Sequence, residues 1–140
     1  MGLKPYYLGD TSALARIAKP LVASRLAPLI EAGLVARCTP TDLEAGYSAR
    51  SATDYQRIRA ARSAWPLARI DQHVLDRASE VQARLAARSQ HRGAALADLI
   101  IAAAAEAADL VVLHYDTDFD LISDVTGQRT EWVVPAGTVD

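Results

Sequence analysis

Residues 94–110, AALADLIIAAAAEAADL, form an almost entirely apolar run that leads directly into a second apolar run, LVVLHY. Alanines dominate the first run and β-branched valines mark the second, which predicts a buried helix followed by a buried strand. Asp98 and Glu106 interrupt the helix, so we do not expect it to span a membrane. A strand buried on both faces favours a parallel sheet between layers of helices.

The rest of the chain continues this alternation of strands and helices. Strands are predicted at residues 6–8, 34–40, 110–115 and 130–134, and helices at 13–18, 21–33, 41–50, 51–65, 71–88, 94–110 and 117–123. Thr11 or Ser12 is expected to cap the first helix, and Pro28 to kink or break the second. In the helix at 71–88, Val74, Ala78, Val81 and Leu85 recur on one face. The pattern predicts an α/β fold.

Composition places the chain among ordinary globular proteins. A length of 140 residues fits one domain, residues 1–140, and the net charge of −2 requires any basic surface to be local. The single cysteine, Cys38, excludes a disulfide framework or a cysteine-rich zinc site. The first residues resemble no signal peptide, so we expect a cytoplasmic protein without a membrane association.

Four acidic residues are predicted to meet at one edge of the sheet. Asp10 follows the first strand, Glu44 opens the helix after the second, and Asp116 follows the third. Open parallel sheets place their sites at the carboxyl ends of the strands. Asp98 lies near the start of the apolar helix, and an antiparallel crossover brings that start to the same edge.

Each acid also has an ordinary structural explanation. Asp10 fits a turn or an N-cap, Asp116 fits a helix cap, and Thr41 with Glu44 fits a capping box. Asp98 is harder to explain, because a lone carboxylate among leucines and isoleucines must be protonated, paired or bound to a metal.

A divalent cation explains the four acids together. Two like charges about 4 Å apart repel by roughly 4 kcal/mol at an effective dielectric constant of 20. Ligands that are all oxygen favour Mg²⁺, or Mn²⁺, over zinc. Asp118 is expected to make an accessory contact. A calcium loop over the same acids is rejected, because Leu121 and Gly127 stand where that loop needs a glycine and a glutamate.

The stretches YLGDTSAL, TDLEAGYSAR, HRGAALADLIIAAAA and VVLHYDTDFDLI resemble the PIN-domain ribonucleases, in particular the VapC-like toxins of bacterial type II toxin–antitoxin pairs. The likeness covers almost the whole chain. It implies a three-layer α/β/α domain with a short, mostly parallel central sheet, and a metal-dependent endoribonuclease that hydrolyses RNA phosphodiester bonds. The family's catalytic and metal-binding acids match Asp10, Glu44, Asp98 and Asp116, with Asp10 and Asp98 as the first choice for direct ligands.

The resemblance also implies accessory residues and partners. Thr11 or Ser12 matches the hydroxyl beside the first aspartate, and Asp118 matches an accessory acid. Arg16 and Arg92 are the arginines best placed to bind the RNA substrate. A cognate antitoxin is expected to cover the site with a basic side chain, and a homodimer is expected to form through the early helices, with apolar surface at 21–32.

Two other functions are open at this point. A dehalogenase-like phosphoryl-transfer enzyme would use Asp10 as nucleophile, but it needs an aspartate where Ser12 stands. A non-catalytic binding module would use the acids only as helix caps and solubilising charge.

Overall fold

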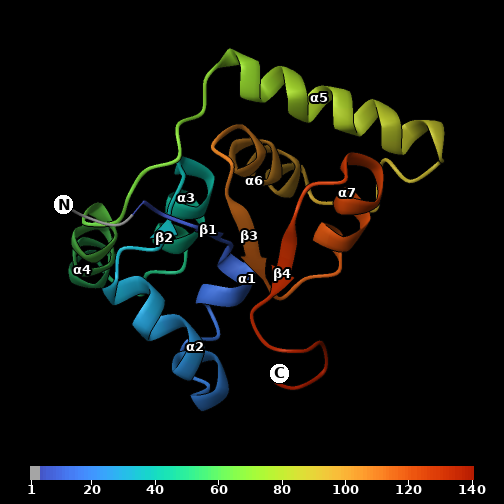
Figure 1. Cartoon of the computed structure of the whole chain (residues 1–140). Helices are drawn as coiled ribbons and strands as arrows, with labels where there is room; N and C mark the ends of the chain where they lie inside the picture. The colour runs from blue at the N-terminus through green and yellow to red at the C-terminus, as the bar shows by residue number, and fades with distance from the viewer. Residues whose placement is uncertain (1–3) are drawn as a thin grey trace.

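A short parallel sheet of four strands lies at the centre of the structure, a computed structural model that describes residues 4–140 (Figure 1). The strands are β1 (Tyr7–Gly9), β2 (Val35–Ala36), β3 (Val111–His114) and β4 (Thr130–Trp132). Their order is β2-β1-β3-β4, and every pairing between neighbours is parallel. The expected α/β/α architecture with a short parallel sheet is confirmed.

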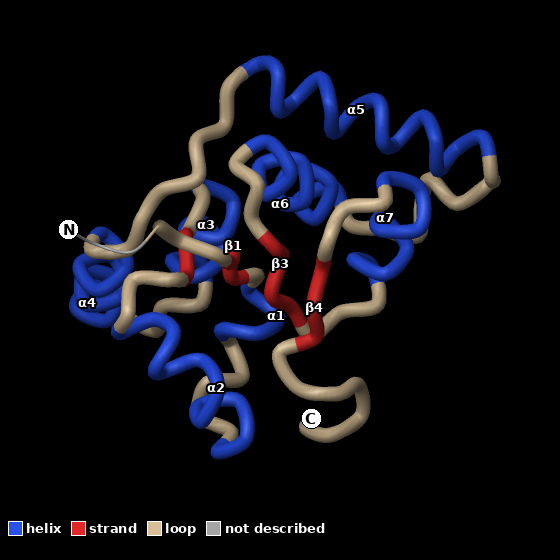
Figure 2. Tube along the Cα trace, in the orientation of Figure 1, coloured by secondary structure: helices blue, strands red, loops and turns tan. Residues whose placement is uncertain are grey.

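Helices cover both faces of this sheet (Figure 2). They are α1 (Thr11–Leu14), α2 (Pro20–Glu31), α3 (Thr39–Tyr47), α4 (Ala52–Ser63), α5 (Gln72–Ala87), α6 (Leu96–Ala107) and α7 (Asp118–Thr126). One apolar core lies between the sheet and helices α5, α6 and α7. A second core joins the opposite face to α1 and α2. Helices α3 and α4 pack together beside β2, at one edge of the sheet.

Helix α5 follows its sequence pattern closely. Asp71 caps it, with a side-chain oxygen accepting a hydrogen bond from the Val74 N–H at 3.0 Å. All four residues of the predicted apolar stripe are buried against the core on α6. Within residues 4–140, no helix has the length and apolar character that crossing a membrane requires.

The first helix differs from its prediction. It is a single turn that begins at Thr11 instead of a longer helix over 13–18, and its cap is Asp10, neither Thr11 nor Ser12. The Asp10 carboxylate accepts a hydrogen bond from the Ser12 N–H at 2.9 Å. The chain then passes through turns at residues 15–18 to Pro20, which starts the next helix, and proline is well suited to a first helical position.

Helix α2 runs unbroken through Pro28, so the break that the sequence allowed at this residue does not occur. A proline removes the N–H that would bond to the carbonyl four residues earlier, here that of Ser24. Both residues are exposed, so water can take the place of the missing donor. The apolar residues Val22 and Leu26 of this helix are fully buried within the protein's own core. They offer no surface for the dimer contact expected at 21–32, where Leu21 is the large apolar side chain left exposed.

Candidate metal centre

The acids converge at the carboxyl ends of the two central strands. Strands β1 and β3 pair in parallel with Gly9 beside Leu113, so the residues that follow them emerge side by side. The N–H of Asp10 donates to the Leu113 carbonyl at 2.9 Å, which continues the pairing by one residue. Asp116 follows β3 two residues after its end, and Asp98 lies in the first turn of α6. The predicted convergence therefore exists.

Three carboxylates approach each other most closely. One oxygen from each of Asp98, Asp116 and Asp118 can be chosen so that all three lie within 4.8 Å of one another. The Asp118 N–H donates to Asp116 Oδ1 at 2.9 Å, and Asp118 Oδ2 accepts from the Ala95 N–H at 3.2 Å. Asp118 thus ties the turn after β3 to the start of α6. Its place in the centre agrees with the accessory contact expected from the sequence.

Asp98 carries the clearest electrostatic signature. Its side chain is only 7% exposed, and its Oδ2 atom is buried without a hydrogen-bond partner. Burial raises the pKa of this carboxyl to about 8, helped by a hydrogen bond with Asp118 and by repulsion from Asp10 and Asp116. A buried carboxylate oxygen with no donor is the condition that a bound cation relieves.

Asp10 is held next to this trio by Ser12. It is 3% exposed, and its Oδ2 accepts hydrogen bonds from both the N–H and the hydroxyl of Ser12. The Ser12 hydroxyl oxygen in turn accepts from the Tyr115 N–H at 2.9 Å. Burial raises the pKa of Asp10, the bonds from Ser12 oppose the rise, and Glu44 and Asp116 add to it. Ser12 therefore links the ends of β1 and β3 and orients one of the acids.

Glu44 reaches the site from helix α3. Its Oε1 accepts a hydrogen bond from the Thr11 hydroxyl at 2.8 Å, and the side chain is exposed. The capping box predicted between Thr41 and Glu44 is wrong, because the helix begins earlier, with Cys38 as its N-cap. Thr41 instead bonds to the Cys38 backbone, accepting from its N–H and donating to its carbonyl. Glu44 is thereby free to face the acids.

The two arginines expected to bind RNA differ in their surroundings. Arg16 donates to the Ser12 carbonyl at 2.7 Å and lies over the Tyr115 ring, 4.7 Å from its centroid. Its charge also lowers the pKa of Asp116, although burial and Asp118 raise that pKa overall. Arg92 is exposed in the loop before α6. The structure therefore places Arg16 beside Asp116, whereas Arg92 is exposed and, among the described residues, forms no hydrogen bond or ion pair with the acids.

His114 is a positioning residue that the sequence interpretation missed. It is fully buried at the end of β3, between Phe119 and Trp132. Its Nδ1 accepts a hydrogen bond from the Asp116 N–H at 3.2 Å, and burial lowers its pKa to about 4. A neutral imidazole thus fixes the backbone at Asp116. A polar residue inside an otherwise apolar strand, directly before the acids, was the available signal.

The donor set fits a hard divalent cation. It offers only carboxylate oxygens, and burial together with the neighbouring acids raises the pKa of Asp10, Asp98 and Asp116. Within residues 4–140, the lone cysteine, Cys38, is buried at the N-cap of α3 and is not part of the cluster. Mg²⁺ and Mn²⁺ both suit such a site.

A mostly apolar groove begins at the same place. It has a volume of about 360 Å³ and is lined by residues of α1, α2, α3 and α4. Thr11 and Glu44 stand at its end nearest the acids, and Leu14, Ile17 and Trp65 line it farther along. Glu44 therefore belongs both to the acids and to the lining of the groove.

Comparisons with known proteins find relatives that match most or all of the chain. The profile of the family described as PIN domain matches residues 7–125. The chain is 54% identical to ribonuclease VapC51 of Mycobacterium tuberculosis over 140 residues, which is all of both chains. It is 46% identical to ribonuclease VapC21 of the same species, covering 94% of this chain and 96% of the relative.

Solved structures share the fold at low sequence identity. The toxin–antitoxin complex VapBC of Salmonella typhimurium, bound to DNA, contains a chain with a TM-score of 0.72 and 19% identity, covering 93% of this chain and 99% of that one. VapBC-5 of Mycobacterium tuberculosis gives a TM-score of 0.58 at 18% identity, covering 91% and 98%.

Proposed function

The chain belongs to the PIN-domain family, and we propose that it is the toxin of a toxin–antitoxin pair, an endoribonuclease that uses Mg²⁺ or Mn²⁺ to hydrolyse RNA phosphodiester bonds. Relatives that match the full length of the chain are named ribonucleases of the VapC type. A cytoplasmic location is part of this proposal, because its substrate is cellular RNA.

The observation that carries the proposal is the orphaned oxygen of Asp98. A buried carboxylate without a donor, beside two further carboxylates, destabilises the fold unless a cation or a proton neutralises it. A purely structural cluster of helix caps would not need that arrangement. The acids thus favour catalysis over the alternative of a non-catalytic binding module.

The roles of the residues follow from their positions. Asp98, Asp116 and Asp118 have carboxylate oxygens close enough to share an ion, and Asp10 would join Asp98 and Asp116 as a ligand from beside them. Asp118 would also fix the turn that carries Asp116, and Glu44 would complete the acidic quartet from α3. When bound, a divalent ion polarises the phosphoryl group, lowers the pKa of an attacking water and stabilises the leaving oxygen. Ser12 orients Asp10. Arg16 and Arg92 would attract the RNA backbone to a pocket that is otherwise acidic.

The partner proposed is a cognate antitoxin that occupies the groove lined by α1, α2, α3 and α4. Its apolar lining suits an apolar segment of a partner, and its end at Thr11 and Glu44 suits a basic side chain that follows the segment. A guanidinium placed there would supply the positive charge that the acids lack. A homodimer remains part of the proposal, although not through the buried face of α2.

Cleavage of a labelled RNA by the purified protein tests this function. The wild type should cut the RNA with Mg²⁺ or Mn²⁺ and stop in EDTA, and Asp98→Asn should lose at least about a hundredfold in rate. Asp124→Asn is the matched control, since this exposed aspartate on α7 lies outside the cluster. Full cleavage by a folded Asp98→Asn variant would contradict the proposal, and a phosphorylated Asp10 would select the dehalogenase-like alternative.

A further inference from the structure

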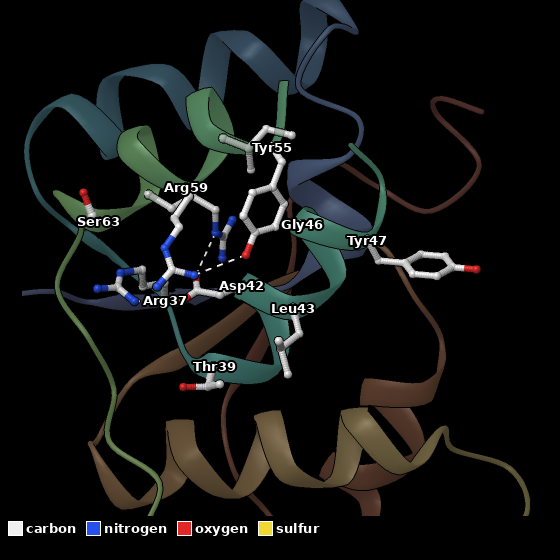
Figure 3. Close-up of a pocket in the computed structure, with 11 residues that line it drawn as sticks. Arg37, Thr39, Asp42, Leu43, Gly46, Tyr47, Tyr55, Arg59 and Ser63 are labelled. Atoms are coloured by element: carbon white, nitrogen blue, oxygen red, sulfur yellow. Dashed lines mark hydrogen bonds and ion pairs between the residues drawn. The ribbon is translucent and has the colours of Figure 1, made fainter. Parts of the chain in front are cut away.

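A second cavity lies between helices α3 and α4 (Figure 3). Its volume is about 580 Å³, within the range of small-molecule pockets. The residues that determine its character are Arg37, Asp42, Gly46, Tyr55, Arg59 and Arg62. It lies outside the acidic cluster, whose members do not line it.

One wall of this cavity is a flat aromatic surface. The Tyr55 ring packs against α3 at Gly46, where an added Cβ would come within 2.9 Å of Tyr55 Cε2. The glycine therefore lets the ring lie close to the helix. Arg59, one turn farther along α4, donates to the Tyr55 hydroxyl at 3.2 Å. Figure 3 shows both side chains projecting from α4 toward α3. The wall thus combines a ring with a guanidinium at its edge.

The cavity has an excess of positive charge. Asp42 accepts from Arg37 at 2.6 Å and from Arg62 at 2.8 Å, so one carboxylate balances two guanidinium groups. In the part of the chain that the structure describes, Arg59 forms no ion pair with a carboxylate. The Nε of Arg37 is buried without a hydrogen-bond partner. Three arginines and one aspartate leave a site suited to an anion.

We propose that this cavity binds one nucleotide of the RNA substrate, with its base against Tyr55 and its phosphate at Arg59 and Arg37. An aromatic ring, an arginine without an ion pair and a further guanidinium N–H without a partner suit single-stranded nucleic acid, because stacking and phosphate contacts both work with any base. The inference rests on the proposed function. Glu44 of the metal centre and Gly46 of the cavity share α3, so the two sites are about one helix diameter apart, ~10 Å.

Binding of RNA without metal tests the site separately from cleavage. A fluorescein-labelled 12-nucleotide RNA of mixed sequence is titrated with protein in EDTA and followed by fluorescence anisotropy. Tyr55→Ala should weaken binding about tenfold, and Tyr55→Phe should keep it within about twofold. Arg59→Ala should weaken binding and reduce the slope of log affinity against log salt by about one. Arg129→Ala is the charge-matched control, because Arg129 precedes β4 at the opposite end of the sheet.

Four results would overturn the inference. In the first, the wild type cuts RNA with metal, and every variant binds RNA as tightly as the wild type does. The proposed function would then stand without the nucleotide site. In the second, light scattering shows that the Tyr55 or Arg59 variant no longer forms a dimer, and its RNA affinity is unchanged. The cavity would then be a protein interface. The third is binding of adenosine monophosphate that needs Tyr55, with unchanged RNA affinity. The fourth is a wild type that binds no RNA.

Discussion

Replacing Asp98 with asparagine should stabilise the metal-free protein at alkaline pH while it abolishes cleavage. The folded protein raises the pKa of Asp98 from its ordinary value of 3.8 to about 8, chiefly through burial. The native state therefore binds a proton more tightly than the unfolded chain does. Stability contributed by this residue is greatest at acidic pH and falls as the pH rises from about 4 to about 8. Asparagine carries no charge and can donate to Asp118 as the protonated acid does.

The size of the effect follows from the same values. If the whole change in pKa were expressed as folding free energy above pH 8, it would amount to about 6 kcal/mol. Asp116 and Asp118 are only partly buried, so water screens part of the repulsion. We therefore expect Asp98→Asn to be more stable than the wild type by about 2 kcal/mol at pH 9. For a chain of this length that is a rise in Tm of roughly 6 °C.

Thermal unfolding followed by circular dichroism in EDTA measures this difference. The two proteins should have nearly equal Tm at pH 5 and diverge as the pH rises to 9. Added Mn²⁺ should stabilise the wild type, by about 2.7 kcal/mol at a hundred times its Kd, and leave the variant unchanged. An Asp98→Asn protein that is less stable than the wild type at pH 9 would refute the reasoning, because it would mean that the ionised carboxylate stabilises the fold.

Three further predictions concern the residues around the site. Thr41→Val should lower the free energy of unfolding by about 1–3 kcal/mol, because the Thr41 hydroxyl bonds to Cys38 and Arg62. Glu44→Gln should change the free energy of unfolding by less than about 0.5 kcal/mol and still reduce cleavage. Urea denaturation and RNA cleavage separate the two variants. Ser12→Ala should weaken Mn²⁺ binding and slow cleavage about tenfold at saturating metal, since Asp10 loses a hydrogen-bond donor. Calorimetric titration of the wild type should show Mn²⁺ affinity rising up to tenfold per pH unit between pH 6 and 8, with protons released.

The alternation of strands and helices was readable from the sequence because apolar patterning is a local signal. The run at 94–115 could only form a buried helix and strand, and the stripe on α5 had a helical period. The convergence of Asp10, Asp98 and Asp116 followed from topology, because parallel strands carry the residues after them to one edge. These predictions needed no knowledge of side-chain contacts.

The sequence did not show which of two competing hydrogen bonds a side chain forms. Thr41 had two partners that local geometry allows, Glu44 and the Cys38 backbone, and the start of α3 at Thr39 decided for the second. The cavity between α3 and α4 depends on how two helices pack, and single-sequence patterns do not encode that. His114 looked like an ordinary strand residue until the structure placed its Nδ1 on the Asp116 N–H.

The strand order β2-β1-β3-β4 has a consequence for engineering the molecule. From β1 the chain winds outward in one direction to β2, and from β3 it winds outward in the other direction to β4. The two windings part between the central strands, and the acids follow these strands at the carboxyl end of the sheet alone. The turn at Ala108 and Asp109, which enters β3 from the opposite end, is exposed. A peptide epitope inserted there would mark the protein for detection and leave the chemistry at the far end untouched.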